Sequence, residues 1–337
     1  MFIIATDTAS LLMMLPKVLY LVVLPMMLLA GLGFMLQRRL GLDMPTLARL
    51  NFYFLIPVVI YHSVLTSQIS GADAALVIGF ALLMMATLAG VSYLAAVIRR
   101  VPREYRSAMM MSAMFDNSGN YGLPLQELTF TPTGQAPTAM AYQAIVMITQ
   151  NFISFTFGVL LAAWGSSTKR PWRGSLMHIA KFPPIWALVL ALITVQIRSW
   201  LGNDAQHVGE SLWPFWKTIG YIREAFVAIA MLTLGAQLAT LGKVQSRYPI
   251  KLTVALRLVV APMIALALIW LLGIRGLTAE VLLLSTTTPT AVNVMLLCLE
   301  FDNHPELAAR AVFYSAVISP LTVTLVILLI RSGLLAA

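Results

Sequence analysis

Charged residues and cysteines are both scarce in this sequence of 337 residues. Only 10% of the residues are charged, whereas 60% are hydrophobic, and the mean hydropathy is +0.87. This composition excludes a soluble globular protein and is typical of a polytopic membrane protein. The single cysteine, Cys298, excludes an intrachain disulfide bond and a thiolate-rich metal site. The net charge of +9 concerns membrane topology rather than a nucleic-acid partner, since basic residues in loops orient membrane helices.

Several motifs that define other classes of protein are also absent. The sequence contains neither HExxH nor GxSxG, and its four histidines are scattered, so an intramembrane enzyme is not expected. It also lacks the phosphate-binding motif GxxxxGK[ST], which excludes this route to ATP-driven transport. We therefore predict no catalytic residues, no metal site and no cofactor.

Ten apolar runs follow one another along the chain. A helix needs about 20 apolar residues to cross roughly 30 Å of hydrocarbon. The runs occupy residues 16–36, 47–65, 74–98, 108–130, 139–164, 176–197, 225–241, 252–272, 277–299 and 308–330. They predict an all-α membrane protein of ten transmembrane helices. The first 15 residues lack the basic region of a signal peptide, so we expect them to remain in the protein. The aromatic stretch 213–216 is interpreted as an interfacial belt before the seventh run.

The loops between the runs alternate in basic content. Sixteen of the 22 Lys and Arg residues fall in loops after odd-numbered runs, when Arg257 is counted with the loop after the seventh. Because basic loops favour the cytoplasm, both termini are predicted to lie on the outer side of the membrane. The chain divides at a short cytoplasmic linker, 166–176, into two five-helix halves, 1–165 and 177–337. An odd number of spans in each half predicts an inverted repeat.

The stretch FDNSGNYGLPL at 115–125 is unusual for a membrane helix. Pro124 removes a backbone donor, and Gly119 and Gly122 loosen the helix, so we predict that the fourth run breaks here. A break frees backbone polar groups, which are tolerated only inside protein or beside a water-filled cavity. The ninth run holds the corresponding position in the second half, and it contains the polar stretch STTTPTAVN with Pro289. Two broken helices that cross near the midplane are predicted to form the binding site.

The sequence resembles the auxin efflux carrier family of bacterial permeases, which are relatives of the plant PIN proteins. Together with the charge pattern, this resemblance implies a multi-pass protein of the bacterial inner membrane whose two termini are periplasmic. The likeness is carried by Asn117, Gly119, Asn120, Gly122, Leu123 and Pro124, by LTLGAQL at 232–238, by 289–293 and by SAVISPLT at 315–322. The resemblance implies a scaffold made of runs one, two, six and seven, and a moving part made of runs three to five and eight to ten. It also implies elevator-type transport of small organic anions such as auxin-like acids, monocarboxylates or dicarboxylates. The short loop between runs five and six departs from the long plant PINs, and argues against auxin itself and against regulation through a phosphorylated loop.

Backbone N–H groups at a helix restart favour an anion, because the positive end of the helix dipole lies there. The predicted substrate-binding residues are Asn117, Gly119, Asn120, Gly122, Leu123, Pro124, Thr288, Pro289 and Asn293. Of these, Gly122, Leu123 and the threonines around Pro289 are expected to supply N–H groups. The three asparagines suit a carboxylate or a cation equally, since an amide both donates and accepts. Their alternative role is to satisfy backbone groups freed by the breaks.

Asp116 is a candidate for coupling transport to H⁺ or Na⁺, because an ionisable residue inside the membrane is costly. Its alternative role is an ion pair with an arginine of the cluster at 99–106. The expected partners are a small organic anion, the coupling ion and the lipid bilayer, with a homodimer as one option for assembly. A sensor that binds such anions without transporting them, or an ion channel, stays open as an alternative function.

Overall fold

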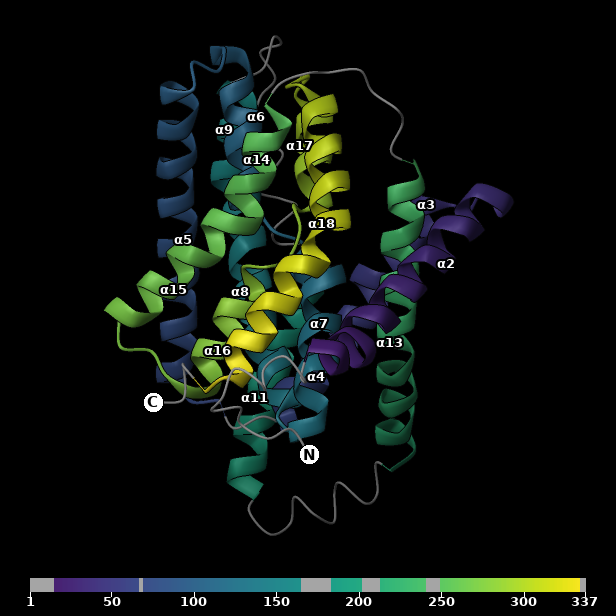
Figure 1. The fold of residues 1–337 in the computed structure, drawn as a ribbon. Coiled ribbons are helices and arrows are strands. Elements are labelled where there is room, and N and C mark those ends of the chain that lie inside the picture. The colour runs from purple at the N-terminus through teal and green to yellow at the C-terminus, as the bar shows by residue number, and fades with distance from the viewer. Residues whose placement is uncertain (1–14, 67–68, 165–182, 202–212, 241–248, 334–337) are drawn as a thin grey trace.

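The computed structural model describes residues 15–66, 69–164, 183–201, 213–240 and 249–333 (Figure 1). Within these residues the secondary structure is helical, apart from one isolated bridge between Asp116 and Thr290. Helices suit a membrane because every backbone group inside them is bonded within the segment. The linker predicted at 166–176 and residues 1–14 lie outside the described residues.

Seven helices in the described part of the chain are long and apolar enough to cross a membrane. They are Leu15–Leu40, Met44–Thr66, Gly71–Ile98, Ala136–Trp164, Trp213–Thr240, Ile250–Leu271 and Pro305–Arg331. This result confirms the prediction of an all-α multi-pass membrane protein. The sixth predicted run corresponds to α11 (Pro183–Leu201), whose first residues fall outside the described part. The fourth and ninth runs are each divided into shorter helices.

The longer spans combine α-helix with short π-helical turns. Their elements are η1 (Leu19–Val23), α2 (Leu24–Leu40), α3 (Met44–Leu50), η2 (Asn51–Leu55), α4 (Ile56–Thr66), α5 (Gly71–Ile98), α8 (Ala136–Ile153), η5 (Ser154–Gly158), α9 (Val159–Trp164), α13 (Trp213–Thr240), α14 (Ile250–Ala255), η7 (Leu256–Val260), α15 (Ala261–Leu271) and α18 (Pro305–Arg331). The aromatic stretch 213–216 forms the first turn of α13, and so lies in the seventh helix rather than before it. The helix starts earlier than predicted because Lys217 and Glu224, which interrupt its apolar pattern, lie on its exposed side.

Local sequence signals fix several helix ends. At the start of α5, the Ser70 hydroxyl accepts a hydrogen bond from the Asp73 N–H at 3.1 Å, and the Asp73 carboxylate accepts one from the Ser70 N–H at 3.2 Å. This reciprocal capping box satisfies two N–H groups that the helix itself cannot bond. At the C-terminus of α2, Gly41 ends the helix with φ of 61°, a left-handed conformation that glycine adopts without strain.

Two glycines allow α2 and α13 to pack backbone against backbone. A side chain at Gly33 would overlap the Leu232 carbonyl, and one at Gly235 would overlap the Ala30 carbonyl. Small residues at such crossings let membrane helices approach closely. Gly235 belongs to the stretch 232–238 that carried part of the family likeness, so this stretch has a packing role. Thr233 in the same stretch accepts a hydrogen bond from the Asn51 amide at 2.7 Å.

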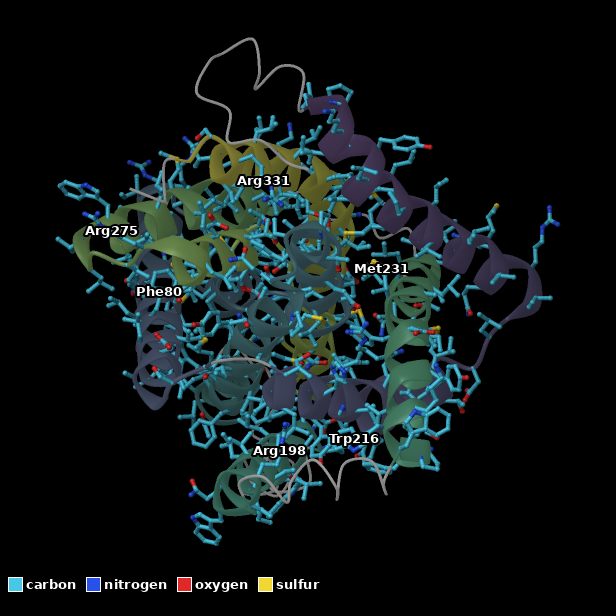
Figure 2. The ribbon with its side chains drawn as sticks, turned by 90° about the horizontal axis from the view of Figure 1, so that it is seen from below. Phe80, Arg198, Trp216, Met231, Arg275 and Arg331 are labelled. Carbon is cyan, nitrogen blue, oxygen red and sulfur yellow. The ribbon has the colours of Figure 1, made fainter. Side chains whose placement is uncertain are left out.

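Two groups of helices lie on opposite sides of the molecule in the view from below. Figure 2 shows Phe80 and Arg275 on one side, with α5, α15 and α16 (Gly276–Ser285), and Met231 and Trp216 on the opposite side, on α13. α13 packs on α2 and α4, and α4 packs on α11. α5 packs on α6 (Arg103–Met114) and on α8, and α18 packs on α6. Large apolar side chains such as Leu28, at 58% exposure, cover the outer surface, as expected for a protein surrounded by lipid.

Candidate functional site

The first interrupted helix enters as α6 (Arg103–Met114) and ends before a short extended segment. Phe115 has φ of −99° and ψ of 121°, so the helix stops there. It restarts at Ser118 with the π-helical turn η3 (Ser118–Gly122) and continues as α7 (Leu123–Phe130). The break lies inside the predicted stretch 115–125, at residues 115–117. Pro124 does not lie at the break itself. It lies in the first turn of α7, directly after the wider π-helical turn, where a residue without an N–H is tolerated.

The second interrupted helix consists of α16 (Gly276–Ser285) and α17 (Val292–Glu300). Between them the chain is unwound, and Ala291 is extended with φ of −65° and ψ of 136°. The hydroxyls of Thr286, Thr287 and Thr288 donate to the carbonyls of Leu283, Leu284 and Ser285 at 2.7, 2.6 and 2.8 Å. The threonines thus bond carbonyls at the C-terminal end of α16, a backbone-satisfying role that the sequence analysis had considered only for the asparagines.

The two unwound segments cross and pair through their backbones. The Asn117 N–H donates to the Pro289 carbonyl at 2.7 Å, and the Ala291 N–H donates to the Phe115 carbonyl at 3.0 Å. This antiparallel bridge gives each break the partners that hydrocarbon cannot supply. Ser315 of α18 extends the network, because its hydroxyl accepts from the Thr290 N–H at 2.9 Å.

Arg257 in η7 holds the crossing together from the side. Its guanidinium lies 3.5 Å from the Asp116 carboxylate, and the two side chains are 1% and 6% exposed. It also donates to the carbonyl of Ala113, at the end of α6, at 3.1 Å, and to the carbonyl of Thr286, at the end of α16, at 2.6 Å. The negative ends of two helix dipoles and one carboxylate therefore meet one buried cation.

The observed partner of Asp116 corrects two predictions. The arginine paired with it comes from η7 and not from the cluster at 99–106. Arg257 is also buried inside a membrane-spanning helix, so it does not belong to the basic loop in which it was counted. A basic residue in the middle of the run LTVALRLVVAPM was the available signal, since an ionisable residue at that depth requires a partner.

A small cavity of about 40 Å³ lies beside the crossing. The predicted site residues that line it are Asp116, Asn117, Gly119, Asn120 and Asn293. Two helices begin at this cavity, at Ser118 and at Val292. The first N–H groups of a helix have no acceptor within it, so both positive helix ends face the same space.

Other predicted site residues lie beside the cavity rather than on its wall. The Gly122 N–H donates to the Asn117 carbonyl at 2.9 Å, and the Thr288 N–H donates to the Ser285 carbonyl at 3.2 Å. The Leu123 N–H is bonded within the π-helical turn. The prediction that these three residues supply free N–H groups is therefore not met. The first helix restarts at Ser118, before Gly122 and Leu123, and the second restarts at Val292, after Thr288. Pro124 and Pro289 likewise do not line the cavity.

The cavity is completed by polar residues that the sequence analysis did not select. Gln150, Asn151 and Ser154 come from the α8–η5 helix, and Gln237 comes from α13. The Asn293 side-chain amide donates to the side-chain Oδ1 of Asn151 at 3.3 Å, and the Asp116 backbone N–H donates to the side-chain Oε1 of Gln150 at 3.2 Å. The signal that could have found them is the pair Gln150–Asn151 inside an apolar run.

The cavity has polar groups that lack a bonding partner. Among the described residues, the Asn117 amide nitrogen and the Asn120 amide oxygen are buried without a hydrogen bond. A volume of about 40 Å³ has room for only a few water molecules. No group of three or more His, Cys, Asp or Glu residues in the described part of the chain could hold a metal ion. The donors are amides and backbone N–H groups, which suit a small polar ligand.

Interrupted helices whose ends meet at a buried polar cavity are typical of membrane transporters. Comparison with known proteins agrees with this class. The sequence model described as "Membrane transport protein" matches residues 18–327. The chain therefore belongs to this family of membrane transport proteins, the auxin efflux carrier family that its motifs indicated.

Two curated relatives come from archaea. An uncharacterized transporter from Methanothermobacter thermautotrophicus is 28% identical over 304 residues, which cover 88% of this chain and 93% of the relative. The uncharacterized transporter MJ1031 from Methanocaldococcus jannaschii is 23% identical over 231 residues, which cover 68% of this chain and 70% of the relative. Both names describe transport and neither specifies a substrate.

Proposed function

We propose that this protein is a secondary transporter of small organic anions that carry a carboxylate, and that the substrate binds at the cavity beside the crossing. One observation carries the proposal: two helix N-termini, at Ser118 and Val292, face a cavity that also presents the amides of Asn117, Asn120 and Asn293. Helix N-termini and amide donors stabilise a carboxylate.

The arrangement of the half-helices supports an inverted repeat of two five-helix halves, 1–165 and 177–337. α6 and α16 approach the crossing from opposite ends of the molecule, and α7 and α17 leave it in opposite directions (Figure 1). In an inverted repeat the corresponding elements have opposite orientation across the membrane. This relation accounts for ten spans, with α6–α7 and α16–α17 as the two interrupted ones.

The position of the cavity supports an elevator-type mechanism. The cavity is lined by Phe52 of η2 and Gln237 of α13, and also by residues of the α8–η5 helix and of the two interrupted helices. The site therefore lies where the proposed scaffold, α2–α4, α11 and α13, meets the proposed moving part, α5–α9 and α14–α18. A cavity of about 40 Å³ is far smaller than the roughly 300 Å³ or more of typical ligand pockets. Movement of one part against the other would open the site for substrate.

The distribution of basic residues supports an orientation with both termini outside. Arg99, Arg100, Arg103 and Lys251 lie at or next to the ends of α5, α6 and α14, which share the upper end of the molecule in Figure 1. This end is proposed to face the cytoplasm. When Arg257 is no longer counted with the loops, most of the basic residues still fall in loops on this side.

Substrate binding by Asn120 and Asn293 can be tested directly. The purified protein is screened by thermal unfolding against a panel of organic acids, since a ligand that binds only the folded form raises its stability. With the best ligand, Asn120→Ala and Asn293→Ala are expected to weaken binding roughly tenfold to hundredfold, because each removes a hydrogen bond worth about 1.5–3 kcal/mol to a charged ligand.

The matched control is Asn303→Ala. Asn303 is also a buried amide, bonded to Ser107 at 2.9 Å and to the Ala162 carbonyl at 3.1 Å, but it does not line the cavity. This variant should lose stability while it keeps ligand affinity. Wild-type affinity in both site variants would show that the ligand binds elsewhere. Flux of radiolabelled ligand into proteoliposomes then separates a transporter from a sensor that only binds.

A further inference from the structure

A second and much larger groove, of about 1080 Å³, is distinct from the small cavity. It runs between the end of α5, the α14–η7 segment and α18. Four basic residues line it: Arg99, Arg100, Lys251 and Arg310. We call this feature the basic groove. It shares no lining residue with the small cavity.

Three separate elements bring these positive charges together. Arg99 and Arg100 follow the last residue of α5, Lys251 is the second residue of α14, and Arg310 lies in the second turn of α18. Among the described residues that line the groove there is no Asp or Glu. Arg99, Arg100 and Lys251 place like charges at one end of the groove, and an anion bound between them would lower their mutual repulsion. The charge of the groove therefore matches an anionic ligand.

The rest of the wall is apolar and open to the surroundings. Ile98 is 68% exposed, Val259 is 57% exposed and Ile318 is 39% exposed. Side chains of this kind at a membrane-facing surface contact lipid tails rather than water. A ligand that fills the whole groove must therefore carry a charged head and an apolar body.

The length of the groove fits one leaflet of a bilayer. Arg310 and Thr322, both in its wall, lie twelve positions apart on α18. At 1.5 Å per residue the groove extends about 18 Å along this helix. Half of a hydrocarbon core of about 30 Å is roughly 15 Å. A headgroup at the basic end would place an acyl chain along the apolar wall to about the bilayer centre.

We propose that the basic groove binds an anionic phospholipid, with its phosphate at Arg99, Arg100 and Lys251 and an acyl chain along Val259 and Ile318. The same end of the molecule carries the basic loops proposed to face the cytoplasm, where anionic lipids create a negative surface potential. Basic pockets between membrane helices at that surface suit such headgroups.

The bound lipid would also contact the segment that holds the crossing. Leu258 and Val259 of η7 line the groove, and Arg257 precedes them in the same turn. Arg257 is directed inward to Asp116, while its neighbours form the outer wall. An occupied groove thus packs against the turn that carries the buried cation, so lipid binding should stabilise the folded protein.

The test uses the purified full chain in phosphatidylcholine–detergent micelles titrated with phosphatidylglycerol, with thermal unfolding as the readout. Saturable stabilisation by phosphatidylglycerol, and none by added phosphatidylcholine, is expected. In the variant Arg99→Gln/Arg100→Gln/Lys251→Gln, the half-saturating lipid fraction should rise at least tenfold, since each basic residue near the surface attracts anionic lipid. The matched control Arg38→Gln/Arg39→Gln/Arg49→Gln removes three basic residues that do not line the groove and should respond as the wild type does.

A second pair of variants tests the apolar wall without changing charge. Ala255 lines the groove, and Ala255→Phe should weaken the response to phosphatidylglycerol, whereas Ala75→Phe on the exposed face of α5 should not. An unchanged lipid response in both the triple variant and Ala255→Phe would overturn the proposal. Equal stabilisation by soluble glycerol phosphate would also overturn it, because a phosphate site needs no acyl chain. Substrate binding at Asn120 and Asn293 is measured separately, so neither proposal depends on the other.

Discussion

The ion pair between Arg257 and Asp116 gives the sharpest prediction about stability. Arg257→Gln leaves the Asp116 carboxylate buried, at 6% exposure, without its cation. Breaking a buried pair by removing one partner costs about 3–5 kcal/mol. The carbonyls of Ala113 and Thr286 also lose a donor. We therefore expect the free energy of unfolding to fall by about 3–5 kcal/mol in this variant.

The double variant Asp116→Asn/Arg257→Gln separates charge from hydrogen bonding. It removes both charges, so it should recover part of the loss, and a coupling energy of about 1–3 kcal/mol is expected from the double-mutant cycle. The recovery is incomplete, since the two helix-end carbonyls still lack the guanidinium. Arg275→Gln is the matched control, because Arg275 precedes α16 at the surface and its loss should change stability by no more than about 0.5 kcal/mol.

The assay is reversible unfolding in mixed detergent micelles, followed by circular dichroism for the wild type, both single variants, the double variant and the control. Two results would refute the reasoning. One is a wild-type unfolding free energy in Arg257→Gln. The other is strict additivity of the two single substitutions, within about 0.5 kcal/mol, since residues that interact do not add.

Three further predictions concern packing, topology and coupling. Gly235→Ala should destabilise the protein by about 1–3 kcal/mol, because its methyl group would meet the Ala30 carbonyl, whereas Gly220→Ala on the same helix, with open space around it, should be neutral or stabilising in the same unfolding assay. On a background without Cys298, Thr133→Cys should react with an impermeant maleimide added to intact cells and Arg100→Cys should not; the reverse pattern would invert the proposed orientation. Asp116→Asn should retain substrate binding and lose the dependence of flux on an imposed pH gradient in proteoliposomes; a response equal to that of the wild type would leave Asp116 with the structural role of pairing Arg257.

The sequence by itself determined the class of protein and the approximate position of each helix. Apolar runs are a local property, because a segment in hydrocarbon must be apolar along its own length. The same reasoning located both interruptions, since a polar stretch with a proline inside such a run does not suit a continuous helix in contact with lipid. It also selected Asn117, Gly119, Asn120 and Asn293, which the structure places on one cavity wall.

The tertiary structure decided which groups meet. The sequence placed the first break within 115–125 and expected Gly122 and Leu123 to supply N–H groups, but the helix restarts at Ser118, so other N–H groups face the cavity. The sequence analysis assigned Arg257 to a loop, whereas in the folded protein this residue pairs with Asp116, 141 positions earlier in the chain. The physical reason is that the partner of a buried charge is set by how distant helices pack, and no local pattern records that packing. The apolar pattern is a property of each helix by itself, whereas the proposed binding site forms only where two interrupted helices cross.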